Sequence, residues 1–228
     1  MNPQQLEHPN DEFKFTLRTA RTEDLTTIRD LVTEVFLASE PTSSYLKISP
    51  AGFHLIYNAF VPEVDLSTTV LAEESRTGEI AAVLVNAPYA SHVDTSIKEG
   101  LAFQQILHEF YEPLKSCILI PQGIPESRVL HCALAATRLK YEGHGLFKAI
   151  LRETLKIATM DPRWDIAMAE ITSPISRHVF VDLFYWNEGH VIRYRDYEID
   201  GKKPFEHLEG EAVLGWTNVD REKPYHLI

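Results

Sequence analysis

One strand–turn–helix stretch constrains the fold of this chain more than any other part of the sequence. The apolar run Val129–Ala136 predicts a short strand that is buried on both sides. A turn with glycines at 143 and 145 follows, and an amphipathic helix is predicted over Leu146–Thr159. Glycines at such a turn let the backbone approach a ligand, and the first free N–H groups of the helix suit a pyrophosphate. The dinucleotide fingerprint G-x-G-x-x-G is absent, because position 148 is lysine.

The rest of the chain alternates strands and helices. Further strands are expected at Phe13–Thr19, Thr68–Glu73, Ile80–Val85, Ile166–Ile171, Val191–Ile199 and Ala212–Val219. Further helices are expected at Leu25–Phe36, ending near Glu40-Pro41, and at Ser49–Asn58, Ile97–Leu114 and Pro174–Trp186. This order predicts an α/β protein with a mixed sheet and helices on both faces. Residues 1–12 are interpreted as a flexible N-terminal tail and residues 13–228 as a single domain.

Charge and composition exclude several classes of partner. The net charge is −11 and no Lys/Arg-rich block occurs, so we expect no nucleic-acid partner. No run of about 18 apolar residues occurs, so we expect no membrane partner. Cys117 and Cys132 lie in apolar contexts and are expected to be buried free thiols, which together with the polar N-terminus favours a cytoplasmic protein. The histidines show no metal-ligand spacing, so no metal is expected.

The glycine turn resembles the acetyl-CoA motif of the GNAT superfamily of acyl-CoA N-acyltransferases. That motif reads Gln/Arg-x-x-Gly-x-Gly/Ala, and here it stands as Lys140-x-x-Gly143-x-Gly145. The resemblance covers residues 13–219 and implies a GNAT-like fold: a central, mostly antiparallel sheet with a splayed parallel strand pair and helices on both faces. It also implies acetyl-CoA as cosubstrate, with its pantetheine arm along the strand and its pyrophosphate on the turn. The cofactor-binding residues implied are Leu134, Ala135, Ala136, Lys140, Tyr141, Glu142, Gly143, His144, Gly145, Leu146 and Phe147.

A second match concerns the acid that protonates the departing thiolate. The segment Asp182–His190 resembles the superfamily's Tyr-x-x-x-Gly-Phe segment, with Tyr185 on the tyrosine and Gly189 on the glycine. His190 replaces the usual phenylalanine. The resemblance implies that Tyr185 is this acid, and the alternative is that Tyr185 is a core aromatic.

A third match narrows the resemblance to the arylalkylamine (dopamine-type) N-acetyltransferases of insects. Glu40-Pro41 resembles their Glu-Pro element, in which the glutamate is the general base through water. Ser173 and Ser176 fall in a Ser/Thr-rich segment that resembles the one assisting proton transfer in those enzymes. His131 is the rival base, because vertebrate members carry histidines on this strand. Glu40 can equally be a solvated helix-end carboxylate and His131 a structural residue, so both assignments stay open.

These observations predict an enzyme that moves an acetyl or other acyl group from acyl-CoA to a primary amine. Direct attack in a ternary complex is expected, with small arylalkylamine or polyamine acceptors, and the acidic net charge weakly favours such cations. The protein is expected to be a monomer or a homodimer. The alternatives are a peptide or protein N-acetyltransferase and a non-catalytic acyl-CoA-binding regulatory protein.

Overall fold

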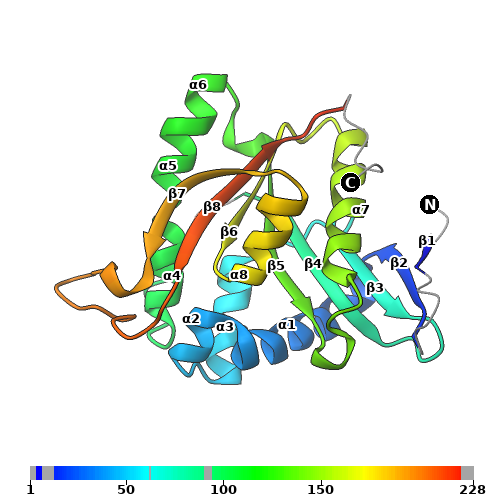
Figure 1. Ribbon diagram of the computed structural model, residues 1–228, viewed down its shortest axis with the longest axis horizontal. Helices are drawn as coiled ribbons and strands as arrows, with labels where there is room; N and C mark the ends of the chain where they lie inside the picture. Colours follow the sequence, from blue (N-terminus) through cyan, green and yellow to red (C-terminus); the bar gives the residue numbers. More distant parts are fainter. Residues whose placement is uncertain (1–3, 7–12, 62, 90–93, 222–228) are drawn as a thin grey trace.

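The core of the protein is one mixed β-sheet. The computed structural model describes residues 4–6, 13–61, 63–89 and 94–221. Within these residues the strands follow the order β1-β2-β3-β4-β5-β6-β8-β7 (Figure 1). The strands are β1 (Gln4–Leu6), β2 (Phe15–Thr19), β3 (Val70–Glu74), β4 (Ile80–Pro88), β5 (Val129–Thr137), β6 (Ile166–Ile171), β7 (Asn187–Arg193) and β8 (Glu211–Asn218). All neighbours pair antiparallel except β5 and β6, which confirms the predicted mostly antiparallel sheet with one parallel pair.

The parallel pair is splayed. β5 and β6 pair only over Val129–His131 and Ile166–Met168, although β5 runs on to Thr137 and β6 to Ile171. Beyond His131, β5 has no partner strand on that side among the described residues. The gap between the two strands therefore leaves the second half of β5 with a free backbone edge.

A β-bulge lies at the same place on β5. Val85 and Asn86 are consecutive on β4, but they pair with Leu134 and Cys132, so Ala133 is an extra residue. A bulge interrupts the ladder and bends the strand. It therefore increases the divergence of β5 from β6 where the gap opens.

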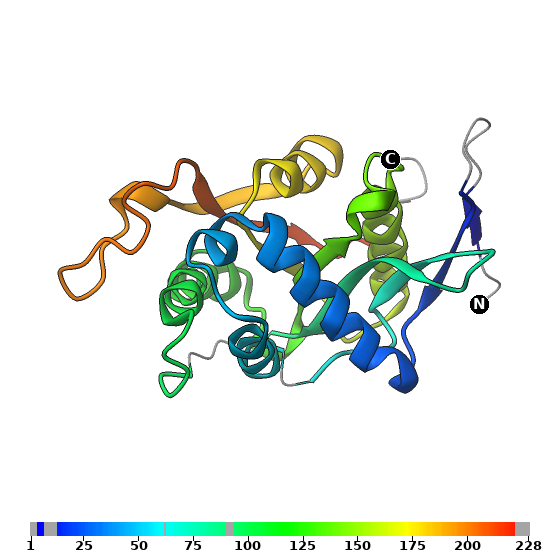
Figure 2. The same ribbon diagram turned by 90° about the horizontal axis from the view of Figure 1, so that it is seen from below.

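Helices cover both faces of the sheet, as predicted. They are α1 (Leu25–Ser39), α2 (Pro41–Tyr45), α3 (Pro50–Phe60), α4 (Leu101–His108), α5 (Tyr111–Pro113), α6 (Ile120–Gln122), α7 (Leu146–Met160) and α8 (Pro174–Arg177). Side chains of α1, α3 and α4 pack into one hydrophobic cluster, and those of α7 into a second cluster across the sheet. Figure 2 shows the two helical layers on opposite sides of the sheet.

Local signals in the sequence set several helix boundaries correctly. The first helix ends at Ser39, before Glu40-Pro41, as predicted. Ser49 caps α3, and its hydroxyl accepts a hydrogen bond from the Gly52 N–H at 3.1 Å. Proline then stands in the first turn of α3, where its missing N–H costs nothing.

Other boundaries differ from the predictions. The helix expected at Ile97–Leu114 begins at Leu101 and is interrupted by a turn at 109–110, after which α5 continues as a π-helical stretch to Leu119. The strand expected at Val191–Ile199 is β7, which ends at Arg193. The helix expected to reach Trp186 ends at Leu183, after a π-helical turn. These segments carry apolar residues without strong caps, so tertiary packing rather than local sequence sets their ends.

Two further findings correct the sequence analysis. The expected N-terminal tail includes β1, which pairs antiparallel with β2, and the rest of that tail lies outside the described residues. Cys132 is buried, as expected, but Cys117 is exposed.

Asp24, just before α1, anchors the start of this helix. Arg18 on β2 donates to both of its carboxylate oxygens at 2.7 and 2.9 Å, and the Arg21 N–H donates at 2.8 Å. The guanidinium of Arg18 lowers the pKa of Asp24, so the carboxylate form stabilises the native state above the unfolded pKa of about 4. This contribution is lost as the pH falls through the lower folded pKa.

We expect Asp24→Asn to lower the free energy of unfolding by about 1–3 kcal/mol at pH 7, because it breaks charge-assisted hydrogen bonds. The deficit should shrink below about pH 4, where the wild type also loses the charge. Asp30→Asn is the matched control, since Asp30 has a side chain 56% exposed. Urea unfolding at pH 7 and at pH 3 measures both variants, and equal deficits at both pH values would contradict the prediction.

Candidate active site

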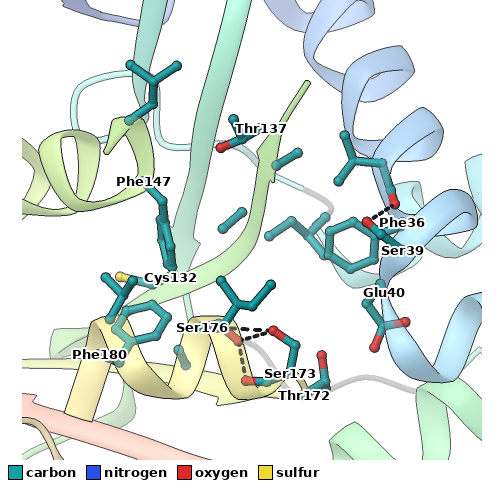
Figure 3. Close-up of a pocket in the computed structure, with 18 of the residues that line it drawn as sticks. Phe36, Ser39, Glu40, Cys132, Thr137, Phe147, Thr172, Ser173, Ser176 and Phe180 are labelled. Carbon is teal, nitrogen blue, oxygen red and sulfur yellow. Dashed lines mark hydrogen bonds between the residues drawn. The ribbon is translucent and has the colours of Figure 1, made fainter. Parts of the chain in front are cut away.

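A cavity of about 610 Å³ passes through the gap between β5 and β6. One end is lined by the glycine turn and the first residues of α7. The other end is lined by α1 and α4 residues and by the junction of α1 with α2. Figure 3 shows Phe147 and Phe180 on one side of this cavity, Phe36 and Glu40 on the other, and Ser173 and Ser176 along its wall. The cavity therefore connects the two faces of the sheet.

The glycine turn has the backbone that an anion site needs. Gly143 and Gly145 have φ angles of 79° and 70°, in the left-handed region that favours glycine. A Cβ atom placed on either residue meets no heavy atom within 4 Å. Gly145 is the N-cap of α7 and supplies no side-chain cap. The first N–H groups of α7 are thus left for another acceptor at the positive end of the helix dipole.

Nine of the eleven residues predicted to bind the cofactor line this cavity. They are Leu134, Ala135, Ala136, Tyr141, Glu142, Gly143, Gly145, Leu146 and Phe147. The free edge of β5 and the turn that follows it therefore form one continuous wall, as the strand–turn–helix pattern predicted.

Lys140 and His144, the other two residues predicted to bind the cofactor, do not line the cavity. The Lys140 ammonium lies 2.5 Å from a carboxylate oxygen of Glu79 and 4.8 Å from the centre of the Tyr141 ring. The His144 ring packs edge-on against Phe15, with its Nδ1 3.0 Å from the Glu142 carbonyl oxygen. Both side chains therefore have other partners.

Lys148, in the first turn of α7, lines the cavity instead. It is the one lysine or arginine on the cavity wall among the described residues. The sequence analysis missed its role, although a lysine at a helix N-terminus, where it opposes the helix dipole, is a usable signal.

Glu40 lies at the opposite end of the cavity and is 8% exposed. It is the N-cap of α2, the short helix that the sequence analysis missed. Its Oε1 accepts from the Thr42 N–H and hydroxyl at 3.1 and 2.9 Å, and its Oε2 accepts from the Ser43 N–H at 2.6 Å. Glu40 is therefore a buried carboxylate held in place by its own helix, and not a solvated helix end.

Ser173 and Ser176 form a hydroxyl pair on the cavity wall. Their Oγ atoms lie 2.8 Å apart. Ser173 caps α8 by accepting from the Ser176 N–H at 3.1 Å, and the Ser176 hydroxyl donates to the Ser173 carbonyl at 3.0 Å. The sequence analysis identified both residues, and the structure brings them to the cavity.

His131 is 1% exposed and does not line the cavity itself. Its Nε2 lies 2.6 Å from Oε2 of Glu170 on β6, and Glu170 does line the cavity. Glu170 was missed by the sequence analysis. Its signal is a single charged residue within the apolar strand Ile166–Ile171, which indicates a buried, paired carboxylate.

Cys132 places a thiol on the same wall, between the glycine turn and Glu170. Burial, and secondarily the charge of Glu170, raise the pKa of this thiol far above its usual range. Cys132 is therefore protonated at neutral pH and is not an activated nucleophile. This agrees with a reaction that needs no covalent enzyme intermediate.

Tyr185 lies on the surface, 77% exposed, and does not line the cavity. Its φ angle of 56° is in the left-handed region, and Trp186 after it is buried against Phe180 with ring centres 4.5 Å apart. The structure therefore places the Tyr185 side chain on the surface and away from the cavity.

We expect Tyr185→Phe to leave kcat within about twofold of the wild type, because the hydroxyl is remote from the cavity. Tyr185→Gly should keep or raise the melting midpoint, since glycine relieves a left-handed conformation that costs other residues roughly 1–2 kcal/mol. Steady-state kinetics and thermal unfolding check the pair. A large loss of kcat in Tyr185→Phe would show that the tyrosine hydroxyl takes part in the reaction and would contradict this prediction.

Comparisons with known proteins bear on this architecture. No protein-family model and no curated protein sequence matches the chain. Solved structures do match. A mosquito arylalkylamine N-acetyltransferase like 5b is 18% identical, with a TM-score of 0.74 over 90% of this chain and 99% of that one. The C-terminal condensation domain of Ebony, in complex with beta-alanyl-dopamine, is 18% identical, with a TM-score of 0.73 over the same shares. A GNAT superfamily phosphinothricin acetyltransferase from Sinorhizobium meliloti, in complex with AcCoA, is 15% identical, with a TM-score of 0.52 over 90% and 88%.

The chain has the GNAT fold. The splayed strands β5 and β6 and the glycine turn before α7 are the parts of the GNAT fold that shape the cavity. Within the described residues, no three His, Cys, Asp or Glu side chains are placed to hold a metal ion. The helices of the described segments are all too short or too polar to cross a bilayer.

Proposed function

We propose that this protein transfers an acetyl or other acyl group from acyl-CoA to a primary amine. The observation that carries the proposal is the continuous cavity, which joins a helix N-terminus without a side-chain cap to two carboxylates. At one end are Gly143 and the N-terminus of α7. At the other end are Glu40 and Glu170.

Acyl-CoA fits the glycine-turn half of the cavity. Its pyrophosphate accepts hydrogen bonds from the free N–H groups at the start of α7, next to Lys148. Its pantetheine arm lies along the free edge of β5, at Leu134–Ala136, and pairs with the backbone as an added strand does. This arrangement delivers the thioester to the gap between β5 and β6.

The amine enters from the opposite face. Apolar side chains of Phe36, Phe103 and Leu107 line this end together with the carboxylates of Glu40 and Glu170. An apolar wall with buried acids suits a small cationic amine that carries an apolar body. We therefore propose an arylalkylamine-type acceptor or a small polyamine, bound with acyl-CoA in a ternary complex.

The reaction is direct attack of the amine on the thioester. The ammonium first loses a proton, because its nitrogen has no lone pair to attack with until then. Two groups are placed to accept this proton, Glu40 and the Glu170–His131 pair. Backbone N–H groups at the bulge of β5 stabilise the oxyanion that forms, a contribution of roughly 3 kcal/mol. The hydroxyl pair of Ser173 and Ser176, rather than Tyr185, lies on the wall to protonate the departing thiolate.

Thiol release from acetyl-CoA tests the proposal directly. The acceptor panel contains phenylethylamine, tryptamine, dopamine, spermidine and short peptides. Turnover with the small amines supports the proposal, whereas turnover with peptides alone indicates a peptide or protein N-acetyltransferase. Acetyl-CoA binding without thiol release across the panel would identify an acyl-CoA-binding protein and overturn the proposed acyl transfer.

A further inference from the structure

We infer that Glu170 binds the ammonium group of the acceptor and takes its proton, and that His131 is the residue that positions Glu170. This inference deepens the proposed acyl transfer and rests on it. The inference identifies Glu170, rather than Glu40, as the proton acceptor, because the hydrogen-bond contacts of the two carboxylates differ.

The side chains of Glu170 and His131 are almost completely buried. The two side chains are 4% and 2% exposed, and the atoms that join them are 2.6 Å apart. The rings of Phe60 and Tyr89 pack edge-on against the imidazole, with centres 5.3 and 5.4 Å from it. These rings fix the plane of His131, which in turn fixes the carboxylate of Glu170.

One of the two carboxylate oxygens of Glu170 is free to accept a hydrogen bond from a ligand. Its Oε2 faces His131, while no described residue donates a hydrogen bond to its Oε1. Because Glu170 lines the cavity, this oxygen is available to a ligand. A bound ammonium would give this oxygen both an opposite charge and a hydrogen-bond donor.

Glu40 differs from Glu170 in this respect. Both of its oxygens accept hydrogen bonds, from the Thr42 N–H and hydroxyl and from the Ser43 N–H. Protonating Glu40 would weaken the cap of α2. The contacts of Glu40 are those of a carboxylate that holds the corner between α1 and α2, and those of Glu170 suit a site for a cation.

The proton and electron count closes without a further reactant. With the imidazole neutral, the Glu170–His131 pair carries one negative charge. It accepts a proton from R–NH3⁺ and becomes neutral. The freed nitrogen lone pair forms the C–N bond, and the C–S bond breaks as the thiolate leaves with the electron pair. The nitrogen then loses its second proton, which passes through the hydroxyls of Ser173 and Ser176 to the thiolate, and the Glu170–His131 pair later returns the first proton to solvent. Among the described residues, the titratable groups next to the pair are Tyr89, which packs on His131, and Cys132, whose thiol the charge of Glu170 reaches, while Glu40 lines the same cavity.

Glu170→Gln is the central variant, because glutamine keeps the shape and loses the charge and the basicity. We expect kcat/KM for the amine to fall about 100-fold, with the acid limb of the pH profile abolished and the dissociation constant of acetyl-CoA unchanged. Glu40→Gln, the comparison, should lower the melting midpoint and keep the acid limb. His131→Gln, which retains a donor to Glu170, should recover part of the rate that His131→Phe loses. Wild-type kinetics and an unaltered pH profile in Glu170→Gln would overturn the inference.

A binding measurement tests Glu170 without turnover. Calorimetry compares phenylethylamine with its neutral isostere 2-phenylethanol, both in the presence of CoA. We expect wild type to prefer the amine at least tenfold and Glu170→Gln to lose this preference. If the wild type prefers the amine but releases no thiol from acetyl-CoA, the proposed acyl transfer is wrong and the cation site at Glu170 stands. The absence of any Glu170-dependent preference would overturn the cation site, whatever the turnover.

Discussion

Replacing Gly143 with leucine should weaken the binding of acyl-CoA about 100-fold while leaving the protein folded. Gly143 has a φ of 79° and lines the cavity, and a Cβ placed there meets no heavy atom within 4 Å. A leucine side chain therefore clashes with nothing in the free protein. It occupies the space over the turn that the pyrophosphate needs, and so blocks hydrogen bonds worth roughly 1.5–3 kcal/mol each to a charged acceptor.

Gly78→Leu is the matched control for this variant. Gly78 lies in the β3–β4 turn, also has a positive φ, of 73°, and also has open space around a Cβ. Both variants carry the same backbone strain, about 1–2 kcal/mol, so thermal unfolding should show similar losses. Calorimetry with CoA should separate them, with Gly78→Leu binding as the wild type does. Wild-type affinity in Gly143→Leu would sink the assignment of the phosphate turn.

The parts of the molecule that could be predicted from sequence are those set by neighbouring residues. The apolar run of β5, the glycines after it and the amphipathic α7 lie within one stretch of about 30 residues, so their pattern records their structure directly. The wall that they form contains nine of the eleven predicted cofactor residues. Glu40, Ser173 and Ser176 were identified through short segments that resemble those of insect arylalkylamine N-acetyltransferases, and in the structure Glu40 and Ser173 are the N-caps of α2 and α8.

The features that the sequence did not reveal depend on residues distant in the chain. The Lys140 ammonium forms an ion pair with Glu79, which is 61 positions earlier. The carboxylate of Glu170 is paired with His131 on the neighbouring strand. The position of Tyr185 depends on where a π-helical turn ends, which shifts the register of everything after it. A match to a short motif carries no information about where such a turn ends, so it could not place the Tyr185 side chain.

Lys148→Glu should stabilise the folded protein but weaken its binding of CoA. Lys148 stands in the first turn of α7, where its positive charge opposes the helix dipole, so glutamate there should stabilise the free protein by about 0.3–1 kcal/mol. The same change places a negative charge beside the pyrophosphate site. We expect the dissociation constant of CoA to rise about 30-fold, or ~2 kcal/mol, and the loss to shrink at high salt.

Lys156→Glu is the control, because it makes the same charge change on the same helix. Lys156 lies in the last two turns of α7, does not line the cavity, and pairs with Glu153 at 3.2 Å. Glutamate at this position faces a like charge and the negative end of the helix dipole, so it should lower the melting midpoint and leave CoA affinity within about threefold. Calorimetry and thermal unfolding on the two variants therefore give opposite patterns. Equal losses of CoA affinity in both would mean that overall charge, and not the α7 terminus, attracts the cosubstrate.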